Sequence, residues 1–188
     1  MNAALFCRHG GPEVLEYVDA PDPAPGPGEV LVRVKACSIN HLDLWIRQGI
    51  PAYAIRLPHI PGSDVAGMVE RTGPGVSSVA VGDRVVLAPG LSCGTCRWCR
   101  AGEDNLCDAY GIRGAKTDGG YAELTVARAI DVLPLPPALS FEEAAAFPRE
   151  RRTGTGSGGE TKIVHAKRAK LPENPTMEPL LLNPRDQS

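Results

Sequence analysis

The chain has 188 residues, an apolar content of 43% and a formal net charge of −2. This composition is typical of a globular protein, and the negative charge disfavours a nucleic-acid partner, which requires a clustered basic face. No apolar run is long enough to span a bilayer, and the first residues lack the pattern of a secretory signal. We therefore expect a cytoplasmic protein without a membrane partner.

The first part of the chain has the pattern of short strands separated by turns. Residues 3–8 and 14–18 read as two strands, whereas the proline-rich residues 21–28 can be neither helix nor central strand. Residues 29–36 alternate between apolar and polar side chains, which predicts a strand with one buried face.

A short helix and a kinked strand follow. Apolar side chains recur at three- and four-residue steps within residues 40–48, Asn40 can cap the start of this helix, and Gly49 can end it. Residues 65–71 read as a strand, in which Gly67 indicates a bulge or a close backbone approach.

Further elements are expected up to residue 147. Ser140 and Glu143 form the S-x-x-E pattern of a capping box, which predicts a helix over 140–147. The pattern also predicts four more strands, at residues 76–81, 84–88, 119–126 and 130–133.

Four of the six cysteines have the spacing C-x2-C-x2-C-x7-C. Four thiolates at such short spacing can surround one ion tetrahedrally, as in structural zinc sites. Disulfides and unrelated free thiols are the alternatives, but neither requires this spacing, and a cytosolic chain keeps its thiols reduced. We therefore predict one structural zinc ion in a lobe at residues 90–115, and we expect Cys7 and Cys37 to be buried free thiols. The predicted ligands are Cys93, Cys96, Cys99 and Cys107.

The last part of the chain has a different composition. Residues 148–188 contain eight basic and five acidic side chains, five prolines and few apolar residues, which predicts a disordered tail. Residues 154–159 match G-x-G-x-x-G, the dinucleotide-binding fingerprint. A charged segment rather than a strand precedes them, so a Gly/Ser linker is the better interpretation and we assign no cofactor-binding residue.

Seven segments together resemble a known family. The chain is similar to the N-terminal, GroES-like domain of the medium-chain dehydrogenase/reductase superfamily, which includes zinc alcohol dehydrogenases and quinone oxidoreductases. This resemblance implies a mainly β fold with short helices: a partly open β-barrel whose four-cysteine lobe holds a non-catalytic zinc. The matching segments are residues 9–15, 40–43, 47–49, 61–67, 81–85, 119–123 and 139–145, together with the cysteine lobe.

The resemblance covers residues 1–147, and it implies that a Rossmann domain binding NAD(H) or NADP(H) should follow. Residues 148–188 contain no pattern for such a domain. We therefore expect a truncated or frame-shifted member that lacks the family's usual dimer surface and, alone, turns over poorly or not at all.

The residues at the family's catalytic zinc site depart from its pattern. Two of the expected ligand positions fall on Asn40 and Ser63, and neither amide nor hydroxyl is a good zinc ligand. Cys37 and His41 lie nearby, but Cys37 is three residues too early to rebuild the site. Asn40 with Asp43 instead resembles the zinc-independent quinone oxidoreductases, so these two are the candidate catalytic residues.

Each candidate also has a plain structural explanation. Asn40 can be a helix N-cap, and Asp43 with Arg47 has the spacing of a surface ion pair on a helix. His59 is a lone histidine that we expect to be hydrogen-bonded or solvated, and Asp64 can fix a turn.

Two functions from different classes follow. The first is an NAD(P)(H)-dependent oxidoreductase, here truncated and with a structural zinc, that transfers a hydride to or from a small quinone, enone, aldehyde or alcohol. The alternative is a stand-alone zinc-stabilised GroES-like β domain that acts as a non-catalytic binding or interaction module.

Overall fold

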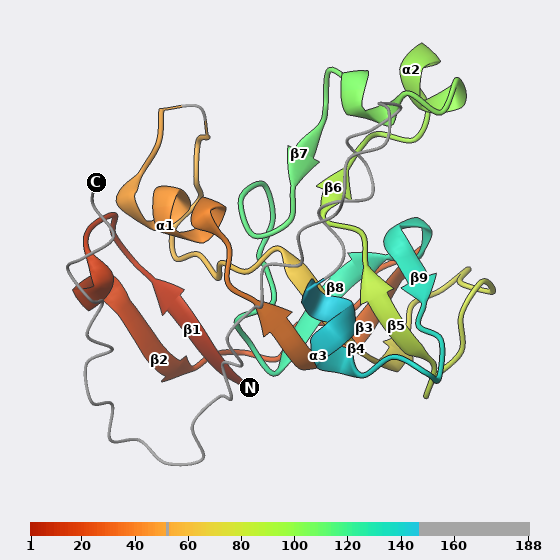
Figure 1. Cartoon of the computed structure of the whole chain (residues 1–188), viewed down its shortest axis with the longest axis horizontal. Coiled ribbons are helices and arrows are strands. Elements are labelled where there is room, and N and C mark those ends of the chain that lie inside the picture. Colours follow the sequence, from red (N-terminus) through yellow and green to blue (C-terminus); the bar gives the residue numbers. More distant parts are fainter. Residues whose placement is uncertain (52, 147–188) are drawn as a thin grey trace.

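A computed structural model describes residues 1–51 and 53–146. In this part of the chain the fold is mainly β with three short α-helices, as predicted (Figure 1). The predictions of a disordered tail and of a linker at residues 154–159 lie outside the described residues.

A five-stranded antiparallel sheet forms the centre of the fold, with the order β8-β3-β4-β5-β9. The long β3 pairs with both β4 and β8, and the sheet curls into a partly open barrel (Figure 1). Valines at alternate positions of β3 and β4 bury one face of the sheet, as the alternation predicts. The strands are β3 (Glu29–Ser38), β4 (Asp64–Thr72), β5 (Arg84–Leu87), β8 (Leu124–Arg128) and β9 (Val132–Pro134).

Gly67 lies at an irregularity in this sheet, as predicted. The register between β3 and β4 shifts between Val34 and Ala36, and Gly67 is the partner of Val34. A Cβ atom on Gly67 would overlap the carbonyl oxygen of Arg33. Only glycine therefore allows the two backbones to approach this closely.

A separate ribbon and helix α1 lie beside the sheet. Strands β1 (Asn2–Phe6) and β2 (Leu15–Asp19) form an antiparallel pair, joined through the 3-10 helix η1 (Pro12–Val14). Helix α1 (His41–Gln48) packs on this ribbon. Their shared core consists of Phe6, Val14, Leu42, Ile46 and Ala115.

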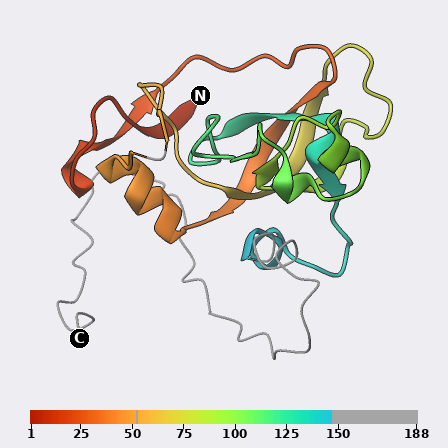
Figure 2. The same cartoon turned by 90° about the horizontal axis from the view of Figure 1, so that it is seen from above.

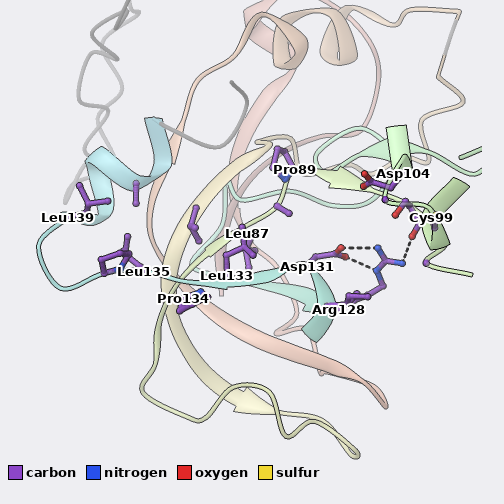
Figure 3. Close-up of a pocket in the computed structure, with 18 residues that line it drawn as sticks. Leu87, Pro89, Cys99, Asp104, Arg128, Asp131, Leu133, Pro134, Leu135 and Leu139 are labelled. Carbon is purple, nitrogen blue, oxygen red and sulfur yellow. Dashed lines mark hydrogen bonds and ion pairs between the residues drawn. The ribbon is translucent and has the colours of Figure 1, made fainter. Parts of the chain in front are cut away.

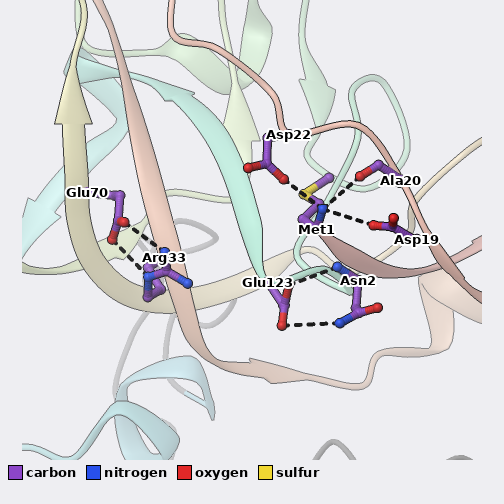
Figure 4. Close-up of polar contacts among 8 residues, drawn as sticks. All are labelled: Met1, Asn2, Asp19, Ala20, Asp22, Arg33, Glu70 and Glu123. Atoms are coloured by element: carbon purple, nitrogen blue, oxygen red, sulfur yellow. Dashed lines mark hydrogen bonds and ion pairs between the residues drawn. The ribbon is translucent and has the colours of Figure 1, made fainter.

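Surface ion pairs join the chain start and neighbouring strands (Figure 4). The Met1 amine lies 2.7 Å from the Asp22 carboxylate, and Arg33 of β3 makes a two-pronged contact with Glu70 of β4 at 2.7 and 2.8 Å. Exposed pairs of this kind contribute little to stability, because water and salt screen them. These ion pairs therefore do not determine the fold.

The starts of α1 and α3 follow the predicted capping patterns. Asn40 caps α1, and Gly49 ends it with φ +85°. At α3 (Phe141–Ala146), the Glu143 amide donates to Ser140 Oγ at 3.1 Å and the Glu143 carboxylate accepts from the Ser140 amide at 2.8 Å. Two alanines of α3 pack against β4, which places this helix on the sheet (Figure 2).

The cysteine lobe projects from the sheet (Figure 1). Its base is the short pair β6 (Gly90–Leu91) and β7 (Gly111–Ile112). Its outer part contains α2 (Arg97–Arg100) and the 3-10 helix η2 (Asp104–Leu106).

Three predicted strands differ in the structure. No strand forms at residues 76–81: Val76 and Val79 pack against the sheet core without strand pairing, so their apolar pattern reflects packing alone. The strand expected from 119 begins only at Leu124, because the preceding amides bond to the loop at residues 60–62. The strand expected at 130–133 begins as the 3-10 helix η3 (Ala129–Asp131), and β9 follows it.

Candidate zinc site and barrel-end cluster

The lobe brings the four predicted zinc-ligating cysteines together. The four Sγ atoms all lie within 4.8 Å of one another, with Cys96–Cys99 at 3.5 Å and Cys93–Cys99 at 3.8 Å. A tetrahedron with zinc–sulfur bonds of about 2.3 Å has sulfur–sulfur edges of about 3.8 Å. The donor set and its spacing therefore fit a closed four-thiolate zinc site.

The backbone around Cys93 favours the thiolate form. Gly94 has φ +76°, and this turn aims two amides at Cys93 Sγ: Thr95 N at 3.5 Å and Cys96 N at 3.3 Å. These amide hydrogen bonds lower the pKa of Cys93 to about 6. The thiolate is the form that binds a metal, so the turn prepares this ligand at neutral pH.

Two arginines fix the lobe to the barrel. Arg128 makes a two-pronged contact with Asp131 at 2.6 and 3.0 Å, and its third nitrogen donates to the carbonyl of Ser92 at 2.6 Å (Figure 3). Arg113 is 2% exposed and donates to the carbonyl of Val126 at 2.9 Å. Neither anchor involves a cysteine side chain.

A second polar cluster lies where β3 ends, α1 begins and β4 begins. The buried Asp43 carboxylate accepts three hydrogen bonds: from Asn40 N at 2.7 Å, from Tyr121 Oη at 2.7 Å and from Gly62 N at 3.1 Å. The surface ion pair expected between Asp43 and Arg47 is therefore wrong, because Asp43 faces the interior. Burial raises the pKa of Asp43, although the three hydrogen bonds oppose this.

Asn40 joins the helix start to the same cluster. Its Oδ1 accepts from the Leu42 amide at 3.2 Å, and its Nδ2 donates to Asp64 Oδ2 at 3.3 Å. Ser38 Oγ donates to the same oxygen at 3.2 Å. These contacts confirm the N-cap role of Asn40. Asp64 instead joins the end of β3 to the start of α1, and its role in fixing its own turn stays a prediction.

Ser63, His41 and Cys37 do not form a metal-binding site in the structure. Ser63 is buried and its hydroxyl has no hydrogen-bond partner within the described part of the chain, whereas His41 is exposed. Burial raises the pKa of the Cys37 thiol well above its ordinary value, which disfavours a thiolate ligand. Within residues 1–51 and 53–146, the lobe cysteines form the only cluster of three or more such donors.

The model of the alcohol dehydrogenase GroES-like domain matches residues 26–137. The chain belongs to this family. The resemblance to the medium-chain dehydrogenase/reductase superfamily is thereby confirmed.

Relatives of this GroES-like chain include several dehydrogenases. An alcohol dehydrogenase of Geobacillus stearothermophilus is 44% identical over 147 residues, which cover 77% of this chain and 43% of the relative. A quinone oxidoreductase of Rattus norvegicus is 35% identical over 148 residues, covering 78% of this chain and 37% of the relative. A solved NAD-dependent alcohol dehydrogenase has a TM-score of 0.76 and 53% identity, covering 79% of this chain and 43% of that structure.

The GroES-like chain thus spans about two fifths of the length of the curated relatives that it matches. Solved structures of the family include enzymes bound to zinc, to NADH and to NADP. In the described part of this chain, none of the helices has the length and apolarity needed to traverse a bilayer.

Two predictions for single side chains of the GroES-like domain have different outcomes. His59 is buried and its Nε2 lies 2.8 Å from the carbonyl oxygen of Gly114, so it is hydrogen-bonded as expected. Cys7 is exposed, so the expectation of a buried thiol is wrong for this residue, whereas Cys37 is partly buried and packs against the sheet core. Cys7 directly follows the last residue of β1, where the chain leaves the packed ribbon.

Sequence reasoning missed the roles of Tyr121 and Arg128. Tyr121 contacts Asp43 from 78 positions away, and Arg128 contacts Ser92 from 36 positions away. No local spacing links these residues. Gly119 and Gly120 were the only sequence signal for the position of Tyr121. They let the backbone before Tyr121 lie close against the loop at residues 60–62.

Proposed function

We propose that this chain forms the GroES-like part of an NAD(P)(H)-dependent oxidoreductase that transfers a hydride to or from a quinone, enone, aldehyde or alcohol. The observation that carries this proposal is the family membership over residues 26–137, together with relatives that are alcohol dehydrogenases and quinone oxidoreductases. The nicotinamide cofactor, when bound, supplies the hydride. Among residues 1–51 and 53–146 we assign no residue to its binding.

In this proposal Cys93, Cys96, Cys99 and Cys107 hold one structural zinc ion. Their sulfur separations fit four-coordination, and four thiolates leave no open position for substrate. The ion therefore stabilises the lobe and takes no part in hydride transfer.

Asn40 and Asp43 are the residues that we propose for the reaction site. Asn40 is partly exposed at the barrel end, so its amide is the group that contacts substrate. Asp43 is buried and acts through others: its carboxylate holds the amides of Asn40 and Gly62 in place. Asp43 is thus a positioning residue rather than a proton donor to substrate.

The alternative is a non-catalytic, zinc-stabilised GroES-like module. The described residues pack around their own buried clusters, including the eight-residue core of the sheet. A domain with its own core can fold and bind a partner without catalysing a reaction.

Metal analysis of the purified chain tests the zinc assignment. We expect one zinc per chain, and we expect Cys93→Ser and Cys107→Ser to lose it while Cys7→Ser, the matched control outside the lobe, retains it. Two zinc ions per chain would overturn our interpretation of Asn40 and Ser63.

Cofactor oxidation distinguishes the two functions. We expect the purified chain to oxidise NADPH or NADH slowly with a quinone, enone or aldehyde, at a rate that falls on the order of tenfold in Asn40→Ala. His41→Ala is the control, because this neighbouring side chain is exposed. A measured rate that Asn40→Ala lowers and His41→Ala does not would favour the oxidoreductase over the non-catalytic module.

A further inference from the structure

Arg128 connects the barrel to one peptide group at the start of the cysteine lobe. It is the last residue of β8, and two of its nitrogens donate to the Asp131 carboxylate at 2.6 and 3.0 Å. Asp131 is only 7% exposed, so this two-pronged contact keeps the guanidinium in one orientation. The third nitrogen donates to the Ser92 carbonyl at 2.6 Å (Figure 3). All three nitrogens of Arg128 therefore take part in the joint between barrel and lobe.

The same peptide group contacts a predicted zinc ligand on its other side. The Ser92 carbonyl and the Cys93 amide belong to one peptide bond, and this amide donates to Cys107 Sγ at 3.4 Å. A donor on the carbonyl oxygen of a peptide polarises it and strengthens the hydrogen bond that its N–H donates. A continuous chain of hydrogen bonds thus leads from Asp131 through Arg128 and the Ser92–Cys93 peptide to the sulfur of Cys107.

Cys107 differs from the other predicted ligands in where its amide donor comes from. Cys93 Sγ accepts from the amides of Thr95 and Cys96, and Cys96 Sγ accepts from the Cys99 amide at 3.5 Å. These donors lie within three positions of the sulfurs that they contact. The donor to Cys107 lies 14 positions earlier in the chain, and its peptide is held by the barrel. The environment of this ligand therefore depends on Arg128.

The charge of a four-thiolate site gives this contact a purpose. Four thiolates carry more negative charge than one Zn²⁺ neutralises, so hydrogen bonds to the sulfurs stabilise the loaded site. Groups that hold metal ligands from behind commonly set the affinity for the ion. Arg128 supplies a positive charge and a fixed donor at the peptide that contacts Cys107.

We propose that Arg128 is a positioning residue for the zinc site, which it serves by holding and polarising the Ser92–Cys93 peptide against Cys107. The proposal rests on the zinc assignment made above and adds the residue through which the barrel sets the affinity of the lobe for its ion. Arg128 acts through the backbone, because a guanidinium has no lone pair to offer a metal. Lysine cannot replace it, since one ammonium does not reproduce the planar fork that holds Asp131 and Ser92 together.

Chelator competition for zinc on the full chain measures the effect. We expect Arg128→Lys to raise the zinc dissociation constant roughly tenfold to hundredfold, as is usual when a group that orients a metal ligand is lost. Arg100→Lys is the matched control, because Arg100 is an exposed arginine at the end of α2 in the same lobe. Its dissociation constant should equal that of wild type. Equal constants for wild type and Arg128→Lys would overturn the proposal.

Amide NMR on the zinc-loaded chain separates positioning from a general loss of structure. In Arg128→Lys the Cys93 amide proton should move upfield and exchange faster, whereas the Thr95 amide, which donates within the lobe, should keep its signal. Asp131→Asn keeps Arg128 but weakens its orientation, so it should move the same Cys93 signal in the same direction by less. Changes spread over the whole barrel, with the Cys93 amide no more affected than others, would show a structural role only and refute the proposal.

The zinc content of wild type distinguishes failure of this proposal from failure of the zinc assignment. A wild-type chain that binds no zinc would refute the assignment itself, and this proposal with it. One zinc per chain in wild type, with the same dissociation constant in Arg128→Lys and Asp131→Asn, would refute the role of Arg128 and leave the assignment intact.

Discussion

Replacing Asp43 with alanine tests whether this carboxylate holds the barrel end together. Its loss leaves the amides of Asn40 and Gly62 without an acceptor, whereas the Tyr121 hydroxyl can rotate to another partner. A buried unsatisfied donor costs about 1–3 kcal/mol. Taking about 1.5 kcal/mol for each amide, we expect Asp43→Ala to lower the free energy of unfolding by about 3 kcal/mol.

Urea unfolding followed by circular dichroism measures this loss. With a slope of about 2 kcal/mol/M, the midpoint should fall by about 1.5 M. Arg47→Ala is the matched control on the same helix, because a surface pair four residues apart contributes only about 0.5 kcal/mol. If both variants lowered the free energy of unfolding by the same small amount, our account of Asp43 would be refuted and a surface ion pair between Asp43 and Arg47 would be the better explanation.

Three other predictions concern metal, packing and pH. Chelation should increase hydrogen exchange within residues 90–115 and leave the barrel protected, because no cysteine takes part in the arginine anchors; loss of protection throughout the chain would contradict this. Gly67→Ala should destabilise by about 2 kcal/mol in the same urea assay, because its Cβ meets the Arg33 carbonyl; an unchanged midpoint would show that the strands separate at little cost. Because folding raises the pKa of Asp43, the folded chain keeps the proton on the Asp43 carboxyl at a pH where the unfolded chain has lost it. The contribution of Asp43 to the free energy of unfolding should therefore fall as pH rises above about 3.8. The difference between wild type and Asp43→Ala in the free energy of unfolding, measured against pH, isolates this contribution. A difference that increases with pH over this range would contradict the prediction.

The features that sequence predicted well are local ones. The capping box of Ser140 and Glu143, the N-cap of Asn40 and the approach of the four cysteine sulfurs each depend on residues within fifteen positions. Backbone geometry over such short distances follows from spacing and residue type. The division of the chain at residue 147 remains a prediction.

The features that sequence could not predict depend on distant contacts. Asp43 has the spacing of a surface pair, but Tyr121 and Gly62 reach it from other parts of the chain and make it a buried centre. Residues 76–81 were expected to form a strand, yet Val76 and Val79 pack against the sheet core without a strand partner. In both cases tertiary contacts override the local pattern.

The metal site is local in sequence, and this has a consequence for the order of folding. All four cysteines lie within residues 93–107, whereas the barrel requires β3 to pair with β8, for example Leu31 with Val126. Short-range contacts form faster than long-range ones. Under the proposed zinc assignment the four sulfurs can therefore meet around the ion before β3 has paired with β8. Arg128 is the last residue of β8, so its contact with Ser92 completes the anchorage of the lobe only when that strand is in place.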